Sequence, residues 1–164
     1  MAWGDSFYRK AGAKIEGQIG EPVEVIGWAS RSGAMGAVIA GKVVGGAEVA
    51  IGGQNSSFIG IPGHHMKVAG NDKGVRLPVN FMVVLTPTAF RVLKISKGWG
   101  GVKIKGELGT LPRDGLVLAI EDSKVTKQFQ LAGTDGSVVR FEMARSKFTT
   151  NFAEQLETAL APSV

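Results

Sequence analysis

The second half of the chain is a series of short apolar segments followed by one amphipathic segment, and this order limits the possible folds most. Six apolar, β-branched runs bounded by Gly, Pro or Asp are typical of strands. They span Val79–Leu85, Phe90–Ile95, Val102–Leu108, Leu116–Ile120, Val125–Leu131 and Val138–Met143. The hydrophobic period then lengthens from two to about 3.6 over Ser146–Leu160. The sequence therefore predicts antiparallel strands capped by a C-terminal helix.

The predicted C-terminal helix carries one apolar stripe, which consists of Phe148, Phe152, Leu156 and Leu160. Ser146 precedes it and is a residue type that favours the N-cap. A stripe of this kind is buried against a sheet or against the mouth of a barrel. We therefore expect Phe152, at the centre of the stripe, to be part of the core.

A second helix is predicted over residues 5–19. Asp5 is a suitable cap, and the helix ends before Gly20 and Pro22. Its apolar stripe consists of Phe7, Ala11, Ile15 and Ile19, while Arg9, Lys10, Lys14 and Glu16 lie elsewhere on its surface. The alternating segment Val23–Trp28 predicts a strand after this helix.

Small residues recur at every fourth position between residues 33 and 53. The row consists of Gly33, Ala37, Gly41 and Gly45. A helix here would present a face almost without side chains, which lets another backbone approach closely. We expect this segment to pack against its own domain or a second copy of the chain. The uncharged run Gly33–Gly41 is much shorter than the roughly 20 residues of a membrane span.

These segments suggest three regions. Residues 1–53 contain the N-terminal helix, a strand and the small-residue helical segment. Residues 54–78 are rich in Gly and polar residues and are expected to form a connector or to carry a binding role. Residues 79–164 are expected to form a barrel with its C-terminal helix.

Two segments of this third region resemble the pleckstrin-homology-like domains of bacteria, of the GRAM-like kind. Val84–Leu93 (VLTPTAFRVL) is similar to a hairpin of that family, and Gly133–Phe141 (GTDGSVVRF) is similar to the hairpin before its closing helix. The Gly/Ala-rich segment ahead of the barrel is also similar to actinobacterial proteins. The resemblance implies an α+β fold with a pleckstrin-homology-like antiparallel barrel, and a binding or scaffolding module without catalysis.

Charge and cysteine content indicate the compartment and the partners. The formal net charge is +5, which favours anionic partners such as a membrane surface or nucleic acid. The chain contains no cysteine, which fits a reducing cytosol. The first residues lack the pattern of a signal peptide. We expect a cytoplasmic protein, peripheral at the inner face of the membrane.

No pattern in the sequence indicates an enzyme, a metal site or a cofactor. Gly36–Val43 is close to a phosphate-binding loop, but Val43 replaces the hydroxyl residue that would hold Mg²⁺. His64 and His65 are adjacent and have no nearby carboxylate or thiol to complete a metal site. A serine nucleophile elbow and a cysteine nucleophile are also missing.

The strongest functional candidate is the predicted hairpin between residues 91 and 105, which contains no acidic residue. It carries Arg91, Lys94, Lys97, Lys103 and Lys105, with Trp99 in its glycine-rich tip. Such a hairpin suits an anionic membrane, because basic residues are attracted to its surface and Trp favours the interface. It equally suits a nucleic-acid backbone, with Trp99 stacked on a base. It is also typical of a solvated edge hairpin, whose lysines discourage aggregation.

We therefore expect a non-catalytic binding or scaffolding module, acting at an anionic lipid surface or with a protein partner and capable of forming a homo-oligomer. A nucleic-acid-binding protein that uses the basic hairpin is the first alternative. A small-molecule enzyme is the second. Binding to anionic vesicles or to nucleic acid at one salt concentration separates the first two.

Overall fold

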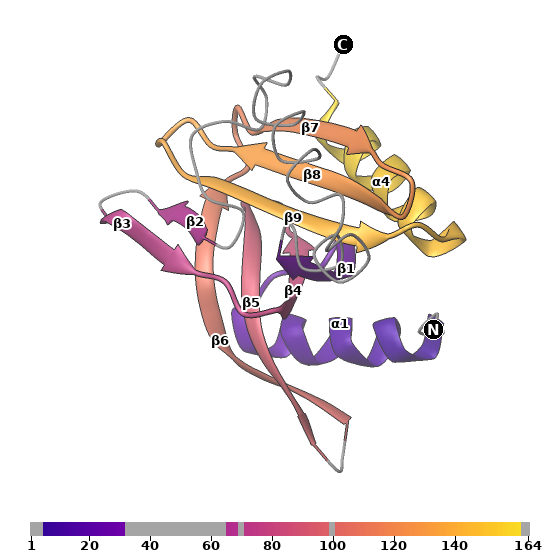
Figure 1. The fold of residues 1–164 in the computed structure, drawn as a ribbon. Coiled ribbons are helices and arrows are strands. Elements are labelled where there is room, and N and C mark those ends of the chain that lie inside the picture. Colours follow the sequence, from indigo (N-terminus) through magenta and orange to yellow (C-terminus); the bar gives the residue numbers. More distant parts are fainter. Residues whose placement is uncertain (1–4, 32–64, 69–70, 99–100, 162–164) are drawn as a thin grey trace.

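The computed structural model describes residues 5–31, 65–68, 71–98 and 101–161 of the 164-residue chain. These residues form two helices and nine strands (Figure 1). In chain order they are α1 (Asp5–Ile19), β1 (Val25–Arg31), β2 (His65–Val68), β3 (Asn71–Arg76), β4 (Asn80–Leu85), β5 (Ala89–Gly98), β6 (Gly101–Pro112), β7 (Val117–Asp122), β8 (Thr126–Ala132), β9 (Val138–Ala144) and α4 (Lys147–Leu160).

The strands form a nearly closed antiparallel barrel. The main path of hydrogen-bonded neighbours is β3-β2-β9-β1-β4-β5-β6, and β8 pairs with both β7 and β9. From β4 to β6 and from β7 to β9, strands that follow one another in the chain also pair with one another. The structure therefore confirms an α+β fold with an antiparallel barrel, a C-terminal helix and an N-terminal helix. All six strands predicted after residue 79 are present, with bounds that differ by a few residues.

Strand β1 belongs to the barrel, although it is far from the other barrel strands in the sequence. It pairs with β4 from Val25↔Leu85 to Ser30↔Asn80, and its end pairs with β9 at Arg31↔Phe141. The barrel therefore includes residues before 79. The predicted strand over residues 23–28 is shifted, because Val23 packs with the cluster beneath α1 and pairing with β4 continues beyond Trp28.

Two strands that were not predicted lie within residues 54–78. They are β2 and β3, which pair with each other, and β2 also pairs with β9 at Lys67↔Val138. Met66 of β2 is fully buried in the core. Their composition gave no strand signal, because Gly74 and several polar residues interrupt the apolar pattern. The predicted helical segment between Gly33 and Gly53 lies outside the described residues.

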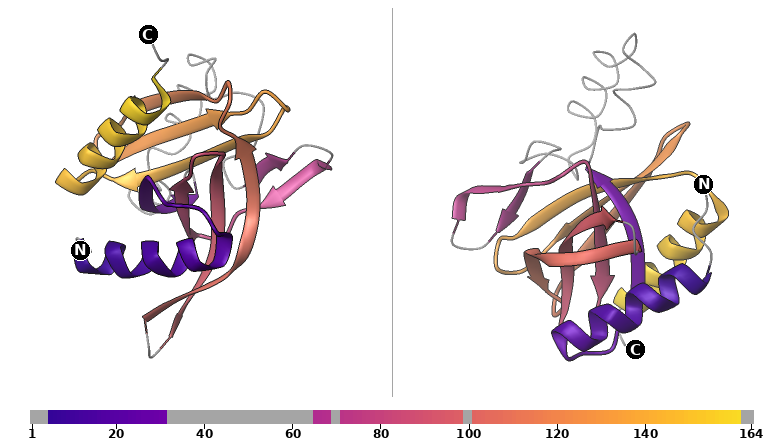
Figure 2. Two further views of the ribbon diagram at one scale, coloured as in Figure 1. Left: turned by 180° about the vertical axis from the view of Figure 1, so that it is seen from behind. Right: turned by 90° about the horizontal axis from the view of Figure 1, so that it is seen from below.

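The core inside the barrel is rich in phenylalanine, and α4 covers it from one side (Figure 2). Phe141 stacks on Phe129 with ring centroids 4.9 Å apart, and Phe152 of α4 meets Phe129 edge to face at 5.4 Å. Ser146 caps α4 by accepting a hydrogen bond from the backbone N–H of Thr149. The predicted burial of Phe152 and Leu156 is confirmed.

Helix α1 covers the outer face of the sheet formed by β1, β4, β5 and β6. Ile15 is buried there with Met82 and Val84, whereas Phe81 and Val83 point into the barrel. Strand β4 therefore has core on both sides, which explains why it reads as an unbroken apolar run. Tyr8 of α1 also stacks on Phe148 of α4, with ring centroids 4.3 Å apart.

Candidate functional site

The basic segment forms the predicted hairpin, made of the two longest strands in the described part of the chain. Strands β5 and β6 pair from Ala89↔Pro112 to Gly98↔Gly101, and the hairpin projects beyond the barrel (Figure 1). Two irregularities in the pairing both add a residue on β6. Side chains on β5 consequently keep their regular alternation between the two faces.

On β5, one face continues the barrel interior and the other faces α1. Phe90 and Val92 belong to the barrel core, while Leu93 and Ile95 belong to the cluster beneath α1. Lys94 lies between Leu93 and Ile95, so its side chain is on the interior-continuing face. Lys94 is exposed because the hairpin has left the barrel at this point.

Strand β6 places Lys103 on the same face and carries Lys105 close to it. Ile104 pairs with Ile95 and packs in the cluster beneath α1, so its neighbour Lys103 points the other way. Lys105 is the extra residue of the irregularity between Ile104 and Gly106, where the regular alternation is interrupted. Both lysines are exposed, and Lys103 lies directly opposite Ser96. We call the surface formed by Lys94, Lys103 and Lys105 the lysine face.

Strand β2 closes the barrel where the lysine face begins. A Cβ atom on Gly109 of β6 would lie 2.7 Å from the Sδ of Met66 and within contact distance of its Cε and of Val68. Gly109 therefore allows β2 to lie close over β6. Along one face of the hairpin, the surface changes from buried and apolar to exposed and basic.

No ion pair within the described part of the chain includes a residue of the lysine face. The ion pairs there are Arg91–Glu21, Arg91–Glu107, Arg113–Glu24 and Lys127–Asp122. An unpaired ammonium group at an exposed position remains available to an external anion. The lysine face can thus attract an anionic partner.

Arg91, also predicted to bind an anionic surface, lies on the other face of β5. Its guanidinium is 3.3 Å from the carboxylate of Glu21 and 3.0 Å from that of Glu107, and its side chain is 19% exposed. Thr110, opposite Arg91 on β6, donates a hydrogen bond to Glu107 as well. Two carboxylates already compensate its charge, so Arg91 differs from the three lysines.

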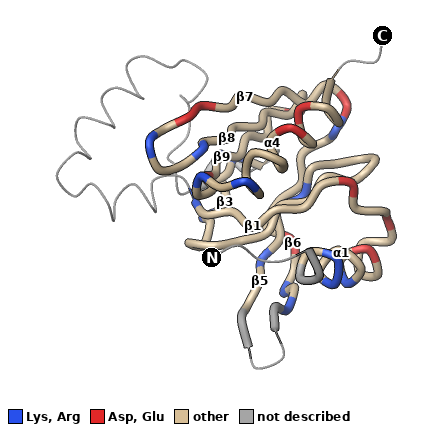
Figure 3. The backbone as a smooth tube through the Cα atoms, turned by 90° about the vertical axis from the view of Figure 1, so that its right-hand side faces the viewer, with Lys and Arg blue, Asp and Glu red and all other residues tan. Residues whose placement is uncertain are grey.

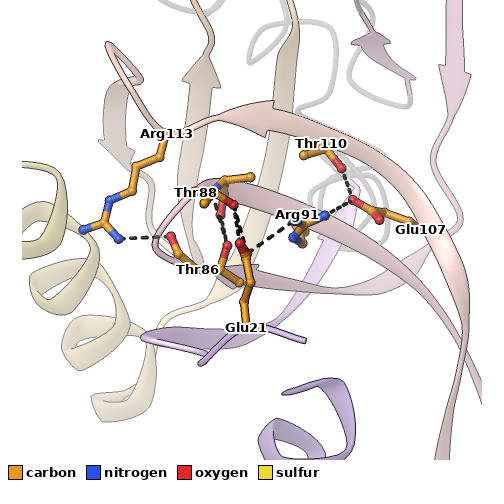
Figure 4. Close-up of polar contacts among 8 residues, drawn as sticks. Glu21, Thr86, Thr88, Arg91, Glu107, Thr110 and Arg113 are labelled. Atoms are coloured by element: carbon orange, nitrogen blue, oxygen red, sulfur yellow. Dashed lines mark hydrogen bonds and ion pairs between the residues drawn. The ribbon is translucent and has the colours of Figure 1, made fainter. Parts of the chain in front are cut away.

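Glu21 links the base of the hairpin to the segment that joins α1 to β1 (Figure 4). It accepts a hydrogen bond from the Thr88 hydroxyl at 2.5 Å, and this bond is the main reason why the pKa of Glu21 is lowered. Hydrogen bonds from Thr86 and Arg91 act in the same direction. This network, which the sequence analysis did not predict, holds the hairpin in a fixed position on the barrel.

Arg113 forms a second link, between the β6–β7 turn and α4. It donates hydrogen bonds to the carbonyl oxygens of Thr86 at 3.0 Å and Ala159 at 2.9 Å, and it pairs with Glu24 at 2.8 Å. In Figure 4 its side chain points from the strand toward the helix. Its contacts stabilise the fold.

A shallow depression of about 450 Å³ lies between α4 and the start of β1. It is lined by Glu24, Val25, Asn151, Glu154, Gln155, Thr158 and Ala159, most of which have polar or acidic side chains. Glu24 is already paired with Arg113.

Several residues singled out in the sequence lie outside the described residues. They are Trp99, His64 and the packing row Gly33, Ala37, Gly41 and Gly45. Lys97 lies opposite Val102 on the hairpin, and its side chain is outside the described part. His65 lies on β2 opposite Arg76. In the described ranges, no group of three or more His, Cys, Asp or Glu residues is placed to hold a metal ion.

No protein-family model, no curated protein and no solved structure matches the chain. Within the described residues, neither helix is long and apolar enough to cross a membrane.

Proposed function

We propose that the protein is a non-catalytic binding module that contacts an anionic membrane surface through the lysine face of the β5–β6 hairpin. The main support is that Lys94, Lys103 and Lys105 are exposed close together on a hairpin that projects from the barrel. Each Lys near such a surface contributes about 1 kcal/mol. The three together would therefore strengthen binding about a hundredfold.

A lipid surface suits this face better than single-stranded nucleic acid does. Proteins that bind single strands combine positive charge with aromatic side chains on which bases stack. On the described part of the hairpin, the lysine face carries Ser96 and three lysines and no aromatic side chain. Charge alone is sufficient for an anionic bilayer.

The topology supports a pleckstrin-homology-like barrel as the finer description of the fold. The first strand, β1, lies between β4 and β9, the remaining barrel strands follow in order, and α4 comes after the last of them. In this description, residues 32–79 are an insertion between the first and second barrel strands. We place the protein in the cytoplasm, where the membrane leaflet is rich in anionic lipids.

Charge reversal on the hairpin tests this function. Lys103→Glu combined with Lys105→Glu should weaken co-sedimentation with vesicles of phosphatidylcholine and phosphatidylserine by at least about 25-fold, at roughly fivefold for each lysine. The matched control is Lys67→Glu with Lys124→Glu, which changes the net charge equally at exposed sites on β2 and in the β7–β8 turn. Circular dichroism should show both variants folded.

Equal losses in the hairpin variant and its control would contradict the proposal, because net charge alone would then explain binding. If the wild-type protein does not bind these vesicles but shifts the mobility of a single-stranded RNA or DNA at the same salt, the protein binds nucleic acid and the membrane proposal is wrong. A protein that binds neither would leave a protein partner or a second copy as the ligand of this module.

A further inference from the structure

Helix α1 has a basic face that the packing of the barrel does not use. Its buried side, which includes Tyr8 and Ile15, packs on the sheet. Arg9, Lys10 and Lys14 are all exposed. At about 100° per residue, Lys10 lies nearly opposite the buried stripe, whereas Arg9 and Lys14 lie on opposite flanks of the helix.

The exposed side of α1 and the β5–β6 hairpin lie at the same end of the molecule. In Figures 1 and 2 the paired ends of β5 and β6 extend past α1, and α1 is the outermost of the other elements at that end. Figure 3 shows the basic positions of both elements close together there. Ile95 and Ile104 of the hairpin pack against the cluster beneath α1, which fixes the two elements relative to each other.

The nearby carboxylates described in the structure have their own partners. Glu16 of α1 accepts a hydrogen bond from the backbone N–H of Val23 at 2.8 Å. Glu21 and Glu107 both pair with Arg91. Arg91 thus compensates Glu21 and Glu107, whereas Glu16 keeps its negative charge on the same helix as the exposed Arg9 and Lys10.

We infer that the exposed face of α1 is a second membrane contact, so that the barrel docks on an anionic bilayer through α1 and the lysine face together. The inference rests on the proposed function of the hairpin. A helix of 15 residues is about 22 Å long, and only an extended surface meets both it and the hairpin at once. The apolar side of α1 is buried against the outer face of the barrel, so the helix contributes charge attraction and no insertion.

The test adds an α1 variant, Arg9→Glu with Lys10→Glu, to the hairpin variant and the control defined above. Both substituted positions are exposed, so the fold should persist, which the thermal unfolding midpoint verifies. The α1 variant should bind phosphatidylserine-containing vesicles at least about 25-fold more weakly than the wild type, at about fivefold per residue. Combining the α1 and hairpin changes should abolish binding, while the Lys67/Lys124 control should lose far less.

An α1 variant that binds as well as the control, when the hairpin variant is weakened, would overturn the second contact and leave the proposed function intact. If the wild type binds the vesicles but neither the α1 variant nor the hairpin variant binds more weakly than the control, both the second contact and the proposed function are overturned. A wild-type protein that does not bind these vesicles at low salt would also contradict both the second contact and the proposed function.

Discussion

Tyr8 shows at the scale of one residue how α1 is held on the barrel. Its ring is 8% exposed and stacks on Phe148 of α4, so it joins the two helices. Burial raises the pKa of Tyr8 to about 12, although a hydrogen bond with the backbone of Trp28 opposes the shift. A buried phenol favours its neutral form because the phenolate loses its hydration.

Tyr8 is the only tyrosine in the chain, so its titration can be followed directly by the ultraviolet absorbance of tyrosinate. The midpoint should lie near pH 12 in the folded protein, against 10 for an ordinary tyrosine. Between these values the unfolded chain loses the proton and the folded chain keeps it. The free energy of unfolding should therefore fall as pH rises through that window, by at most about 2–3 kcal/mol.

In Tyr8→Phe this pH-dependent loss should disappear, while the effects of other titrating groups remain. A tyrosine titration centred near pH 10 before the protein unfolds would show that Tyr8 is accessible to water and that α1 is not docked as described.

Gly27 on β1 is the residue on which the approach of α4 depends most directly. A Cβ atom there would lie 2.7 and 2.9 Å from two ring carbons of Phe152. Gly27→Ala should therefore lower the free energy of unfolding by about 1–3 kcal/mol, measured by urea denaturation. Gly109→Ala should cost less, because the atoms it meets belong to the flexible end of Met66.

Gly17→Ala serves as a control of opposite sign. No atom lies within 4 Å of a Cβ at this exposed position in α1, and Ala is favoured over Gly in a helix by about 1 kcal/mol. Gly27→Ala with the stability of the wild type would contradict the close contact between β1 and Phe152.

At the scale of elements, the features that depend on residues close together in the chain were predicted correctly. The Phe152 stripe, the Ser146 cap and the alternation of the later strands follow from neighbours a few residues apart, and the structure confirms them. The place of β1 between β4 and β9 depends on pairing across some 50 and 110 residues of sequence, which no local pattern encodes. The short strands β2 and β3 were missed because Gly74 and several polar residues interrupt their apolar pattern, although Met66 of β2 is fully buried.

Phe152→Ala tests the part played by α4 in the core. The ring contacts Phe129 and Phe141 edge to face and is almost fully buried, so its removal should cost about 3–5 kcal/mol. Glu157→Ala, at an exposed position on the same helix, should change stability by less than about 0.5 kcal/mol. Equal unfolding midpoints for these two variants would show that the stripe is not core.

At the scale of the whole molecule, charge is unevenly placed although the net charge is only +5. The hairpin as a basic element was predictable, because Lys94, Lys103 and Lys105 occur in a run without acidic residues. The separation of Arg91 from these lysines was not predictable, because Glu21 reaches it from the other end of the chain. The position of the basic residues of α1 beside the hairpin was also not predictable from the sequence, because it depends on how the fold brings the two elements together.

The most direct test of the membrane contact compares the wild-type protein on two kinds of vesicle at low salt. It should co-sediment with vesicles that contain phosphatidylserine and remain in solution with vesicles of phosphatidylcholine alone. Added salt should release it progressively, because the screening length falls from about 30 Å at 0.01 M to about 10 Å at 0.1 M. Equal binding to both kinds of vesicle, or no binding to either, would contradict an electrostatic contact through the basic end of the barrel.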